Sequence, residues 1–482
     1  MLSVSEPAVS ERTPLASPIS VPVLRATGEH PSREVARLLS VDGEPLAEVS
    51  QAPPLLVRRA LDEMRRAPAQ PTAERLAALR KAGELFGTAT LAGESPQAYA
   101  RSHALATGTP VGVAERALGR YAAFTAGLEA LVAAERPAGA GGRGARWVPR
   151  GTVLGVIAPS NHPGVHISWL QALALGYRVA VRPGARDPFT PARLIRALRA
   201  AGLEPGWATL LPGSHAAADA LVAASDLAIV YGGPDAEERY GGSRRVLVRG
   251  PGRTKSVVLG GDPGPAALDH LVREIAGDGG VRCTNTTAVF TDGDHRRLAE
   301  ALADRLAALP ALPVTDPRAV LPARAPDEAA ALRRALDGRL AGAVDVTAAH
   351  YTGEDRHPRA YGHGHCLLRP AVLLCDRPDH PGLAVELPFP CVWVAPWTPG
   401  HGVAPLRDSL ALTVLAEPGH PYAAELVRQA LAEPSVRTVL EGAVEEWWLD
   451  PGIPHDGQLG QFLMEARGHM SGHMTGDDSH DA

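Results

Sequence analysis

The sequence predicts an α/β protein whose 482 residues form two domains, each built around a largely parallel sheet. The evidence lies in two blocks, residues 151–254 and 255–440, where short β-rich runs alternate with segments that repeat apolar residues every three or four positions. Strand and helix in succession are typical of βαβ crossovers, which produce parallel sheets with a ligand crevice beyond the carboxyl ends of the strands. A chain of this length has room for two or three domains.

The chain before the first block contains three segments with different sequence patterns. Residues 1–44 show no periodicity, and we expect an irregular N-terminal arm. Residues 45–134 include "PPLLVRRALDEMRRAP" and "RALGRYAAFTAGLEALVAAERP", whose apolar spacing predicts amphipathic helices that pack on another part of the protein. Residues 135–150 are rich in glycine and arginine and predict a hairpin or linker.

The predicted strands of the first block end in loops suited to ligand binding. The runs "GTVLGVIAPS", "YRVAVRPG", "WATLLPG" and "DLAIVYGG" each lead through glycine, proline or polar residues into a helix start. Helix starts offer unpaired backbone amides to phosphate groups. No GxGxxG motif follows any of these strands, so this block by itself does not demonstrate a standard dinucleotide site.

The second block extends from "KSVVLGGDPG" to "HPYAAELVRQALAE" and contains Cys283 within "DGDGGVRCTNTTAVF". Residues 467–482 are polar, and we expect a disordered tail. The two His-Met pairs of this tail are more typical of disorder than of metal binding, so no metal site is predicted.

The composition excludes several classes of protein. The formal net charge of −5 provides no basic surface for nucleic acid. No apolar run reaches roughly 18 residues, and the N-terminus lacks the pattern of a signal peptide, so we expect a cytoplasmic protein without a membrane span. The four cysteines are scattered without CxxC spacing, which favours thiols over disulfides or a zinc site.

Six motifs occur in an order that points to one family. They are "APSNHP", "VRPGARDPFTP", "VYGGP", "VVLGGDP", "GGVRCTN" and "ELPFPCVWV". In this order and spacing the chain resembles the aldehyde dehydrogenase superfamily over about residues 45–465. The resemblance implies two Rossmann-type α/β domains with a small β oligomerisation arm.

The resemblance also assigns the segments. Residues 45–134 and 151–254 would form the nicotinamide-cofactor domain, and residues 255–440 the catalytic domain. Residues 135–150 and 441–466, with "EEWWLD", would form an arm that joins subunits into a homodimer or tetramer.

The resemblance assigns the chemistry to Cys283 and Asn161. A cysteine thiolate adds to an aldehyde carbonyl, the alkoxide loses hydride to the cofactor, and a thioester remains on the enzyme. Cys283 aligns with this nucleophile, and Asn161 aligns with the side chain that, with the cysteine backbone amide, stabilises the alkoxide. The other cysteines lie in apolar runs and are expected in the core: Cys366, Cys375 and Cys391.

The same resemblance implies a set of cofactor contacts, and it favours NADP over NAD. The implied contacts are Pro159, Ser160, Arg182, Pro183, Arg186, Gly213, Gly232, Gly233, Gly260, Glu386 and Phe389. Ala185 stands where many members carry an acidic residue that repels a 2′-phosphate, and Arg186 follows it. Arginine binds phosphate by charge-assisted, often bidentate hydrogen bonds, so this pair of positions favours NADP.

One departure from the family concerns the fate of the enzyme thioester. Hydrolytic members have a glutamate two residues before the first glycine of "LGG", and this sequence has Val258 there. Without a general base, hydrolysis loses typically ~10²–10⁴ in rate. Members that lack this glutamate include acylating ones, and "YGGP" also resembles that branch. We therefore expect an enzyme that interconverts an aldehyde and an acyl thioester of CoA or a carrier protein.

Two other hypotheses stay open. Asp262, His162 or Glu386 could replace the missing base, which would give ordinary oxidation of an aldehyde to a free acid. The altered motifs also suit a non-catalytic relative that serves in binding or assembly, although retention of Asn161 and Cys283 argues against it. The family's loop at the substrate entrance is replaced by "PGIPHDGQLGQFLM", so the substrate itself is not predicted.

Overall fold

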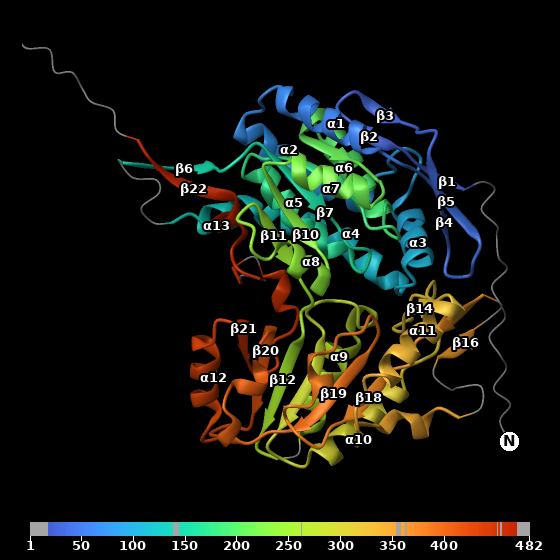
Figure 1. The fold of residues 1–482 in the computed structure, drawn as a ribbon, viewed down its shortest axis with the longest axis vertical. Coiled ribbons are helices and arrows are strands. Elements are labelled where there is room, and N and C mark those ends of the chain that lie inside the picture. The colour runs from blue at the N-terminus through green and yellow to red at the C-terminus, as the bar shows by residue number, and fades with distance from the viewer. Residues whose placement is uncertain are drawn as a thin grey trace, which may run out of the picture.

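The computed structural model describes residues 18–137, 144–261, 263–352, 358–361, 364–450, 452–453 and 456–469. Within these residues the chain forms two seven-stranded sheets, which Figure 1 shows one above the other. Helices cover both sheets, as the sequence predicts for two α/β domains.

The first sheet has a parallel centre. Its strand order is β11-β10-β7-β8-β9-β2-β3, with parallel pairs from β11 to β9 and antiparallel pairing of β2 with both neighbours. The strands are β7 (Val153–Ile157), β8 (Arg178–Arg182), β9 (Ala208–Leu210), β10 (Leu227–Tyr231), β11 (Val246–Arg249), β2 (Val23–Arg25) and β3 (Gly28–His30). The helices between its parallel strands are α5 (Ile167–Ala174), α6 (Phe189–Ala200), α7 (His215–Ala224) and α8 (Pro234–Tyr240).

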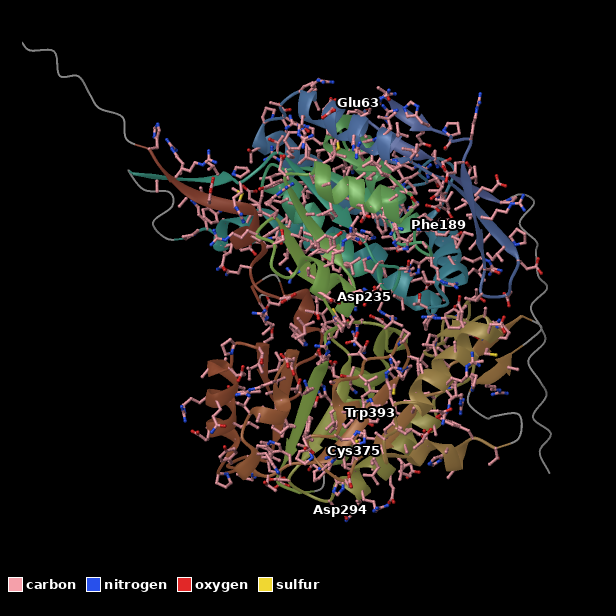
Figure 2. All side chains as sticks on the ribbon, viewed as in Figure 1. Glu63, Phe189, Asp235, Asp294, Cys375 and Trp393 are labelled. Carbon is pink, nitrogen blue, oxygen red and sulfur yellow. The ribbon has the colours of Figure 1, made fainter. Side chains whose placement is uncertain are left out.

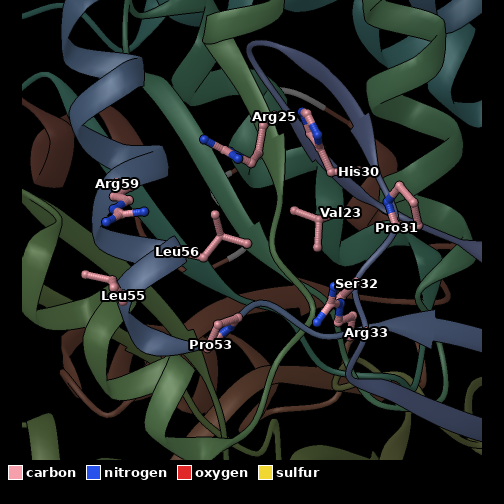
Figure 3. A pocket seen from close by; sticks show the side chains of 10 residues that line it. All are labelled: Val23, Arg25, His30, Pro31, Ser32, Arg33, Pro53, Leu55, Leu56 and Arg59. Atoms are coloured by element: carbon pink, nitrogen blue, oxygen red, sulfur yellow. The ribbon is translucent and has the colours of Figure 1, made fainter.

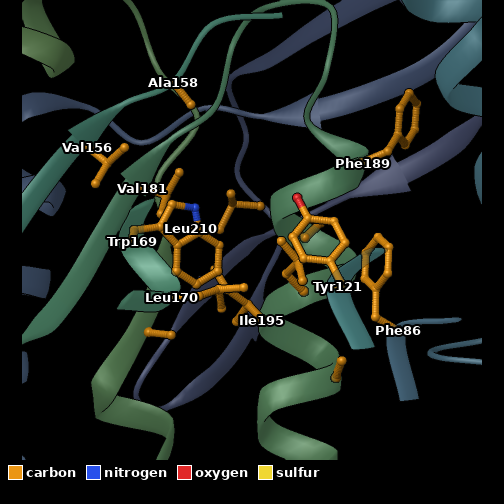
Figure 4. Packing of buried hydrophobic residues seen from close by; sticks show 14 of the residues in the cluster. Phe86, Tyr121, Val156, Ala158, Trp169, Leu170, Val181, Phe189, Ile195 and Leu210 are labelled. Carbon is orange, nitrogen blue, oxygen red and sulfur yellow. The ribbon is translucent and has the colours of Figure 1, made fainter. Parts of the chain in front are cut away.

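Further helices from residues 45–134 pack on this domain, as their apolar spacing predicts. They are α1 (Pro54–Arg66), α2 (Thr72–Thr88), α3 (Pro96–Thr107) and α4 (Val111–Ala134). In the core, Trp169 lies beside Val181 and Leu210 of the sheet (Figure 4). Phe86 and Tyr121 meet edge to face, with ring centroids 4.6 Å apart.

A buried arginine ties α6 to the end of α2. Arg193 is 0% exposed. Its Nε donates to the carbonyl of Phe86 at 3.0 Å, its Nη2 to that of Ala89 at 2.7 Å and its Nη1 to that of Glu94 at 2.9 Å. The last carbonyls of a helix have no partner inside the helix, so the planar fork of a guanidinium suits this place.

Replacing Arg193 with lysine is expected to lower the free energy of unfolding by about 1–3 kcal/mol, because the ammonium leaves at least one buried carbonyl without a donor. Urea denaturation measures the change. The matched control is Arg80→Lys on α2, whose side chain is 52% exposed. We expect the control to change the unfolding free energy by less than about 0.5 kcal/mol. Equal losses in the two variants would contradict this role of Arg193.

The expectation of an irregular arm at residues 1–44 is wrong for the described part of that segment. Besides β2 and β3, it contains β1 (Ile19–Val21) and β4 (Val35–Leu39), which pair with β5 (Pro45–Ser50) in a three-stranded sheet. The strands have three to five residues, too few for a clear periodicity. β2 is defined by a distant partner, because Leu24 pairs with Leu210.

The second sheet has the strand order β15-β18-β19-β13-β12-β20-β21, parallel except for β15. Its strands are β12 (Thr254–Leu259), β13 (Thr286–Thr291), β15 (Val344–Asp345), β18 (Ala371–Leu374), β19 (Cys391–Pro396), β20 (Ser409–Ala416) and β21 (Val436–Glu441). The helices of this half of the chain are α9 (Pro265–Ala276), α10 (His295–Ala307), α11 (Pro326–Asp337) and α12 (Ala423–Ala432). A small antiparallel sheet contains β14 (Ala323–Arg324), β16 (Arg359–Tyr361) and β17 (His365–Leu367).

The core of this domain contains the three cysteines that the sequence assigns to it. Cys366, Cys375 and Cys391 are buried in one apolar cluster with Trp393. Figure 2 shows Cys375 and Trp393 in the lower domain.

A two-stranded ribbon projects from the side of the molecule (Figure 1). It pairs β6 (Ala145–Pro149) with β22 (Met464–Gly468) in antiparallel register. The predicted arm is corrected in one part: "EEWWLD" does not join the ribbon, because Trp447 is 2% exposed and packs on Ala411 and Leu440. Residues 467 and 468 belong to β22, so the expected tail is wrong there, and residues 470–482 lie outside the described part.

The described helices include none that combines the length and the apolar character needed to cross a membrane.

Candidate active site

A cavity of about 940 Å³ is lined by both domains and contains the predicted catalytic pair. The first domain contributes Pro159, Asn161, Gly232 and Gly233 from loops that follow β7 and β10, and the second contributes Cys283 and Glu386. This is the carboxyl-end edge of the first sheet, where an α/β fold binds its ligands.

A second cavity, of about 410 Å³, lies between the β2–β3 hairpin and α1 (Figure 3). Its lining includes Arg25, Arg33 and Arg59, and it contains none of the predicted site residues.

The backbone around Cys283 is held in a tight turn between α9 and β13. Asp278, Gly279 and Gly280 have positive φ, which reverses the chain. Thr254 donates its hydroxyl to the Cys283 carbonyl at 2.9 Å. Gly252 packs so closely that a Cβ there would lie 1.7 Å from the same carbonyl oxygen. These contacts fix the position from which the thiol reaches the cavity.

The electrostatic surroundings of Cys283 keep its thiol protonated in the ligand-free protein. Burial raises the pKa of the Cys283 thiol to about 12, with smaller raising effects from Glu386 and Asp456. Arg249 and Arg282 act in the opposite direction. A nucleophilic thiolate at neutral pH therefore depends on these two guanidiniums and on what binds in the cavity.

Alkylation of Cys283 by iodoacetamide is expected to accelerate about tenfold per pH unit between about pH 7 and 9.5, because the thiolate fraction grows tenfold per unit below the pKa. Peptide mass spectrometry of the ligand-free protein measures the rate at this cysteine. Cys375, which is 0% exposed, should stay unmodified in the same samples. A plateau near pH 8.5, as in a small-molecule thiol control, would contradict the raised pKa.

The side chain of Asn161, in the first domain, forms a hydrogen bond to the second domain close in sequence to Cys283. Its Nδ2 donates to the carbonyl of Val281, two residues before Cys283, at 2.8 Å. A primary amide carries two N–H donors, so one remains for a ligand oxygen. The amide oxygen is buried and makes no hydrogen bond within the described residues. The arrangement places a polar donor of the first domain beside the thiol of the second.

His162 is engaged at both ring nitrogens. Nδ1 accepts the N–H of Gly164 at 3.0 Å, so Nε2 carries the proton that lies 3.1 Å from the Asp278 carboxylate. Burial lowers the pKa of His162, which keeps the ring neutral. Asp278 also lies 3.6 Å from Arg282 and 3.7 Å from Arg120. A neutral imidazole bound in this way has no lone pair left for a water proton.

Three of the predicted cofactor residues of the first domain line the cavity: Pro159, Gly232 and Gly233. Arg182 donates from Nε to the carbonyl of Gly213 at 3.0 Å, and the hydroxyl of Ser160 accepts the N–H of Arg186 at 3.0 Å. Pro183 is buried beside Arg182. The Arg186 guanidinium, however, pairs with Glu328 of α11.

The sequence did not predict that ion pair. Nη1 of Arg186 also donates to the carbonyl of Ala106 at 3.3 Å. The contact of Arg186 with a 2′-phosphate stays a prediction.

Three other predictions fall outside the cavity. β12 starts at Thr254, beside the cavity, and at about 3.3 Å per residue it is roughly 20 Å long. Val258 and Gly260 lie at its other end. Val258 is 3% exposed and packs in the core against α9 and α10, and Phe389 is 1% exposed in the core on the other side of the sheet. Neither lines the cavity, and the contact of Phe389 with a cofactor stays a prediction. Asp262 lies outside the described residues.

Glu386 does line the cavity. Its Oε2 accepts the backbone N–H of Arg253 at 2.9 Å. Burial raises the pKa of this carboxyl, although the backbone N–H groups of Arg253 and Gly252 partly offset the effect. The carboxyl is thereby held next to the turn that touches Cys283.

The glycine turn that meets Cys283 belongs to a motif that the sequence analysis missed. It is Gly250-Pro251-Gly252, which follows β11, and the residue before it is Arg249. Arg249 lines the cavity and pairs with Asp456, its Nη1 lying 2.5 Å from Oδ2. The signal was available in "VLVRGPGR", a β-rich run ending in a glycine turn, but "SVVLGGDP" has the same form.

The cavity can accept a nicotinamide dinucleotide, the cofactor that the fold implies. Gly232 and Gly233 follow β10 and precede α8, and nothing lies within 4 Å of the place a Cβ would occupy at Gly233. A bare backbone at a helix start permits close approach of phosphate oxygens. The volume and the glycine-lined wall therefore fit the cofactor.

Comparisons of the sequence and of the structure with known proteins support the assignment of this fold and site. The model of the aldehyde dehydrogenase family matches residues 28–397. Malonate-semialdehyde dehydrogenase 3 of Geobacillus kaustophilus (strain HTA426) is 30% identical over 172 residues, which cover 33% of this chain and 35% of the relative. Malonate-semialdehyde dehydrogenase 1 of the same organism is 26% identical over 163 residues, 32% and 33% of the two chains. The chain thus spans about a third of the length of these curated relatives.

Solved structures match almost the whole chain. The NAD-dependent aldehyde dehydrogenase from Sinorhizobium meliloti has a TM-score of 0.79 at 18% identity and covers 96% of each chain. An indole-3-acetaldehyde dehydrogenase complexed with NAD+ has a TM-score of 0.78 at 18% identity, covering 94% of this chain and 97% of its own. The E. coli NADP dependent enzyme has a TM-score of 0.76 at 17% identity, covering 94% and 98%. Together with the family match, the fold and the gathered motifs show that the chain belongs to the aldehyde dehydrogenase family.

Proposed function

We propose that this protein is an NAD(P)-dependent oxidoreductase that interconverts an aldehyde and an acyl thioester, of CoA or of a carrier protein, through a thioester on Cys283. The observation that carries the proposal is the position of Arg249, a guanidinium at the end of the strand whose glycine turn touches Cys283. A guanidinium stays protonated and cannot activate water. In this turn the residue two positions before the first glycine is Val248, which also lines the cavity, so the argument from the missing glutamate moves from Val258 to Val248.

The residues divide the work as follows. Cys283 attacks the carbonyl carbon, and Asn161 donates its second N–H to the oxygen as negative charge develops there. The bound nicotinamide exchanges hydride with the carbon attached to Cys283.

Two polar groups of the cavity are bound to protein partners, which supports transfer to a thiol over transfer to water. Asp456 is paired with Arg249, and both ring nitrogens of His162 are engaged. We propose NADP or NAD as cofactor, with NADP favoured because the exposed Ala185 offers no carboxylate to repel a 2′-phosphate. The projecting β6–β22 ribbon supports assembly into a homodimer or tetramer, since its strands have edges left to pair within the described residues.

One observation favours a second candidate, hydrolytic oxidation of an aldehyde to an acid. Glu386 is the carboxylate with the largest electrostatic effect on Cys283, and burial raises its own pKa. A carboxylate in that state can take a proton from water. Its hydrogen bond from Arg253 holds it in place for either role.

The deciding experiment follows the absorbance of the reduced nicotinamide with purified protein, NADPH or NADH and acetyl-, propionyl- or malonyl-CoA. Thioester-dependent oxidation that is absent in Cys283→Ala is the expected result. The reverse assay supplies propionaldehyde and the oxidised cofactor with and without CoA. Free acid formed at the same rate without any thiol, and no oxidation with thioesters, would overturn the proposal in favour of the hydrolytic candidate.

A further inference from the structure

Arg249 is the charged group that most distinguishes this cavity, and its place is fixed by the fold. It ends β11, the edge strand of the first sheet, and its carbonyl accepts the N–H of Gly232 at 3.1 Å. Three residues later Gly252 lies against the carbonyl of Cys283. The Arg249 side chain is 13% exposed and lines the same cavity as the thiol. A nearly buried guanidinium in the same cavity as a nucleophile calls for a chemical reason, because burying a charge is costly.

A carboxylate from the C-terminal segment holds the guanidinium in place. Asp456 accepts from Arg249 through its side chain at 2.5 Å, and its backbone carbonyl accepts from the same Nη1. Arg437 of β21 lies 3.7 Å from the other oxygen of Asp456. Two guanidiniums therefore share one carboxylate, so the three side chains carry two positive charges and one negative charge.

Thioester exchange and hydrolysis make opposite demands on a group beside the thioester. Hydrolysis starts from neutral water and needs a base that removes a proton. Exchange with a thiol passes through an anionic sulfur, which is stabilised by a fixed cation and by charge-assisted hydrogen bonds. Arginine provides both and has no basicity of its own.

We propose that Arg249 is a catalytic residue of thioester exchange whose guanidinium donates to the sulfur of the thiol that leaves, or attacks, the acyl group on Cys283. The inference rests on the proposed function and deepens it by naming the residue that favours a thiol over water. Asp456 is the positioning residue that orients the guanidinium.

In the direction of thioester reduction the step balances as follows. The Cys283 sulfur forms a bond to the acyl carbon, and the bond from that carbon to the thiol sulfur breaks. The departing sulfur takes the electron pair and binds at Arg249. The proton lost by Cys283 ends on the departing thiol. Nothing is oxidised or reduced in this step, and the reverse sequence transfers the acyl group from Cys283 to the thiol.

The test compares Arg249→Gln and Arg249→Lys with the wild-type chain and with Arg244→Gln, a change of the same charge at an exposed residue just before β11. We expect Arg249→Gln to lower the rate with propionyl-CoA by about 10- to 150-fold, the range for loss of a charge-assisted hydrogen bond, and Arg249→Lys to recover part of it. The burst of reduced cofactor from propionaldehyde in the absence of any thiol serves as the second readout. The burst precedes the exchange step, so it should fall by less than the rate with propionyl-CoA, although Arg249 also lowers the pKa of the Cys283 thiol.

A leaving-group series separates catalysis from a merely structural effect. An aryl thiol carries negative charge more easily than an alkyl thiol, so the loss in Arg249→Gln should shrink with thiophenyl propionate compared with propionyl-CoA. Equal losses with both thioesters, or an equally reduced burst, would overturn the role proposed for Arg249.

Charge reversal gives a further prediction of the same proposal. Arg249→Glu puts a carboxylate beside the thioester, and we expect thioester-dependent turnover to fall while release of free acid from propionaldehyde rises above that of the wild type. Wild-type protein that reduces propionyl-CoA, with Arg249→Gln unchanged, would refute the inference and leave the proposed function standing. Wild-type protein that makes only free acid would refute the proposed function itself.

Discussion

Replacing Cys283 with alanine is expected to abolish cofactor-linked turnover, with a loss of roughly 10⁴-fold or more, as is typical when a covalent nucleophile is removed. The reason is that every step of the proposed reaction passes through a bond to this sulfur. The turn around residue 283 should survive the change, because its contacts from Thr254 and Gly252 are made to the backbone carbonyl.

The loss is measured as the rate of NADPH oxidation with acyl-CoA thioesters and as the burst of reduced cofactor from aldehyde. Cys375→Ala is the matched control: its sulfur is 0% exposed in the core, so its removal should cost stability and leave turnover within a few-fold. Residual thioester-dependent turnover in Cys283→Ala above about 1% of wild type would mean that another group carries the acyl chain.

The sequence alone was sufficient to predict that Cys283 and Asn161 lie in one site. Cys283 and Asn161 lie in loops whose lengths are set by the strands before and after them, and the structure brings both into one cavity through the bond from Asn161 to Val281. Asn161 follows β7, at the carboxyl end of the first sheet, where such a fold binds its ligands, whereas Cys283 precedes β13 at the amino end of the second sheet. The roles of the two residues remain predictions.

The sequence analysis chose the wrong one of two similar glycine motifs as the neighbour of Cys283, for a physical reason. Both "VLVRGPGR" and "SVVLGGDP" are a β-rich run followed by a glycine turn, and they adjoin in the chain. Which turn meets the thiol depends on long-range packing, namely the contact of Gly252 with Cys283. Local pattern cannot distinguish a strand that ends at the cavity, β11, from one that starts there, β12.

Long-range packing also explains the other differences between the predicted and the observed structure. Phe389 follows a segment near the cavity, but its side chain points into the core. In an extended segment, a shift of one residue moves each side chain to the opposite face. Asp456 is separated from Arg249 by about two hundred residues, and no local signal links them. The strands before residue 40 are likewise defined by partners elsewhere in the chain.

Replacing Asn161 with alanine is expected to slow the attack of Cys283 on its substrate by about 10²–10³-fold, the usual cost of losing one donor to a developing oxyanion. The amide is held by the Val281 carbonyl, so its second N–H is fixed before substrate arrives and needs no reorganisation. A fixed donor favours the state in which the oxygen carries negative charge over the neutral carbonyl, which is why the loss should appear in the rate more than in KM.

The measurement is the single-turnover burst from aldehyde and oxidised cofactor, which isolates formation of the acyl enzyme from its breakdown. Asn161→Asp is the matched comparison, because it keeps the size of the side chain but places a carboxylate beside the oxyanion. We expect it to be slower than Asn161→Ala at neutral pH, since like charges repel at this distance. Asn161→Asp at wild-type rate would show that the side chain acts by shape, through the contact with Val281, and that the alkoxide is stabilised by other donors.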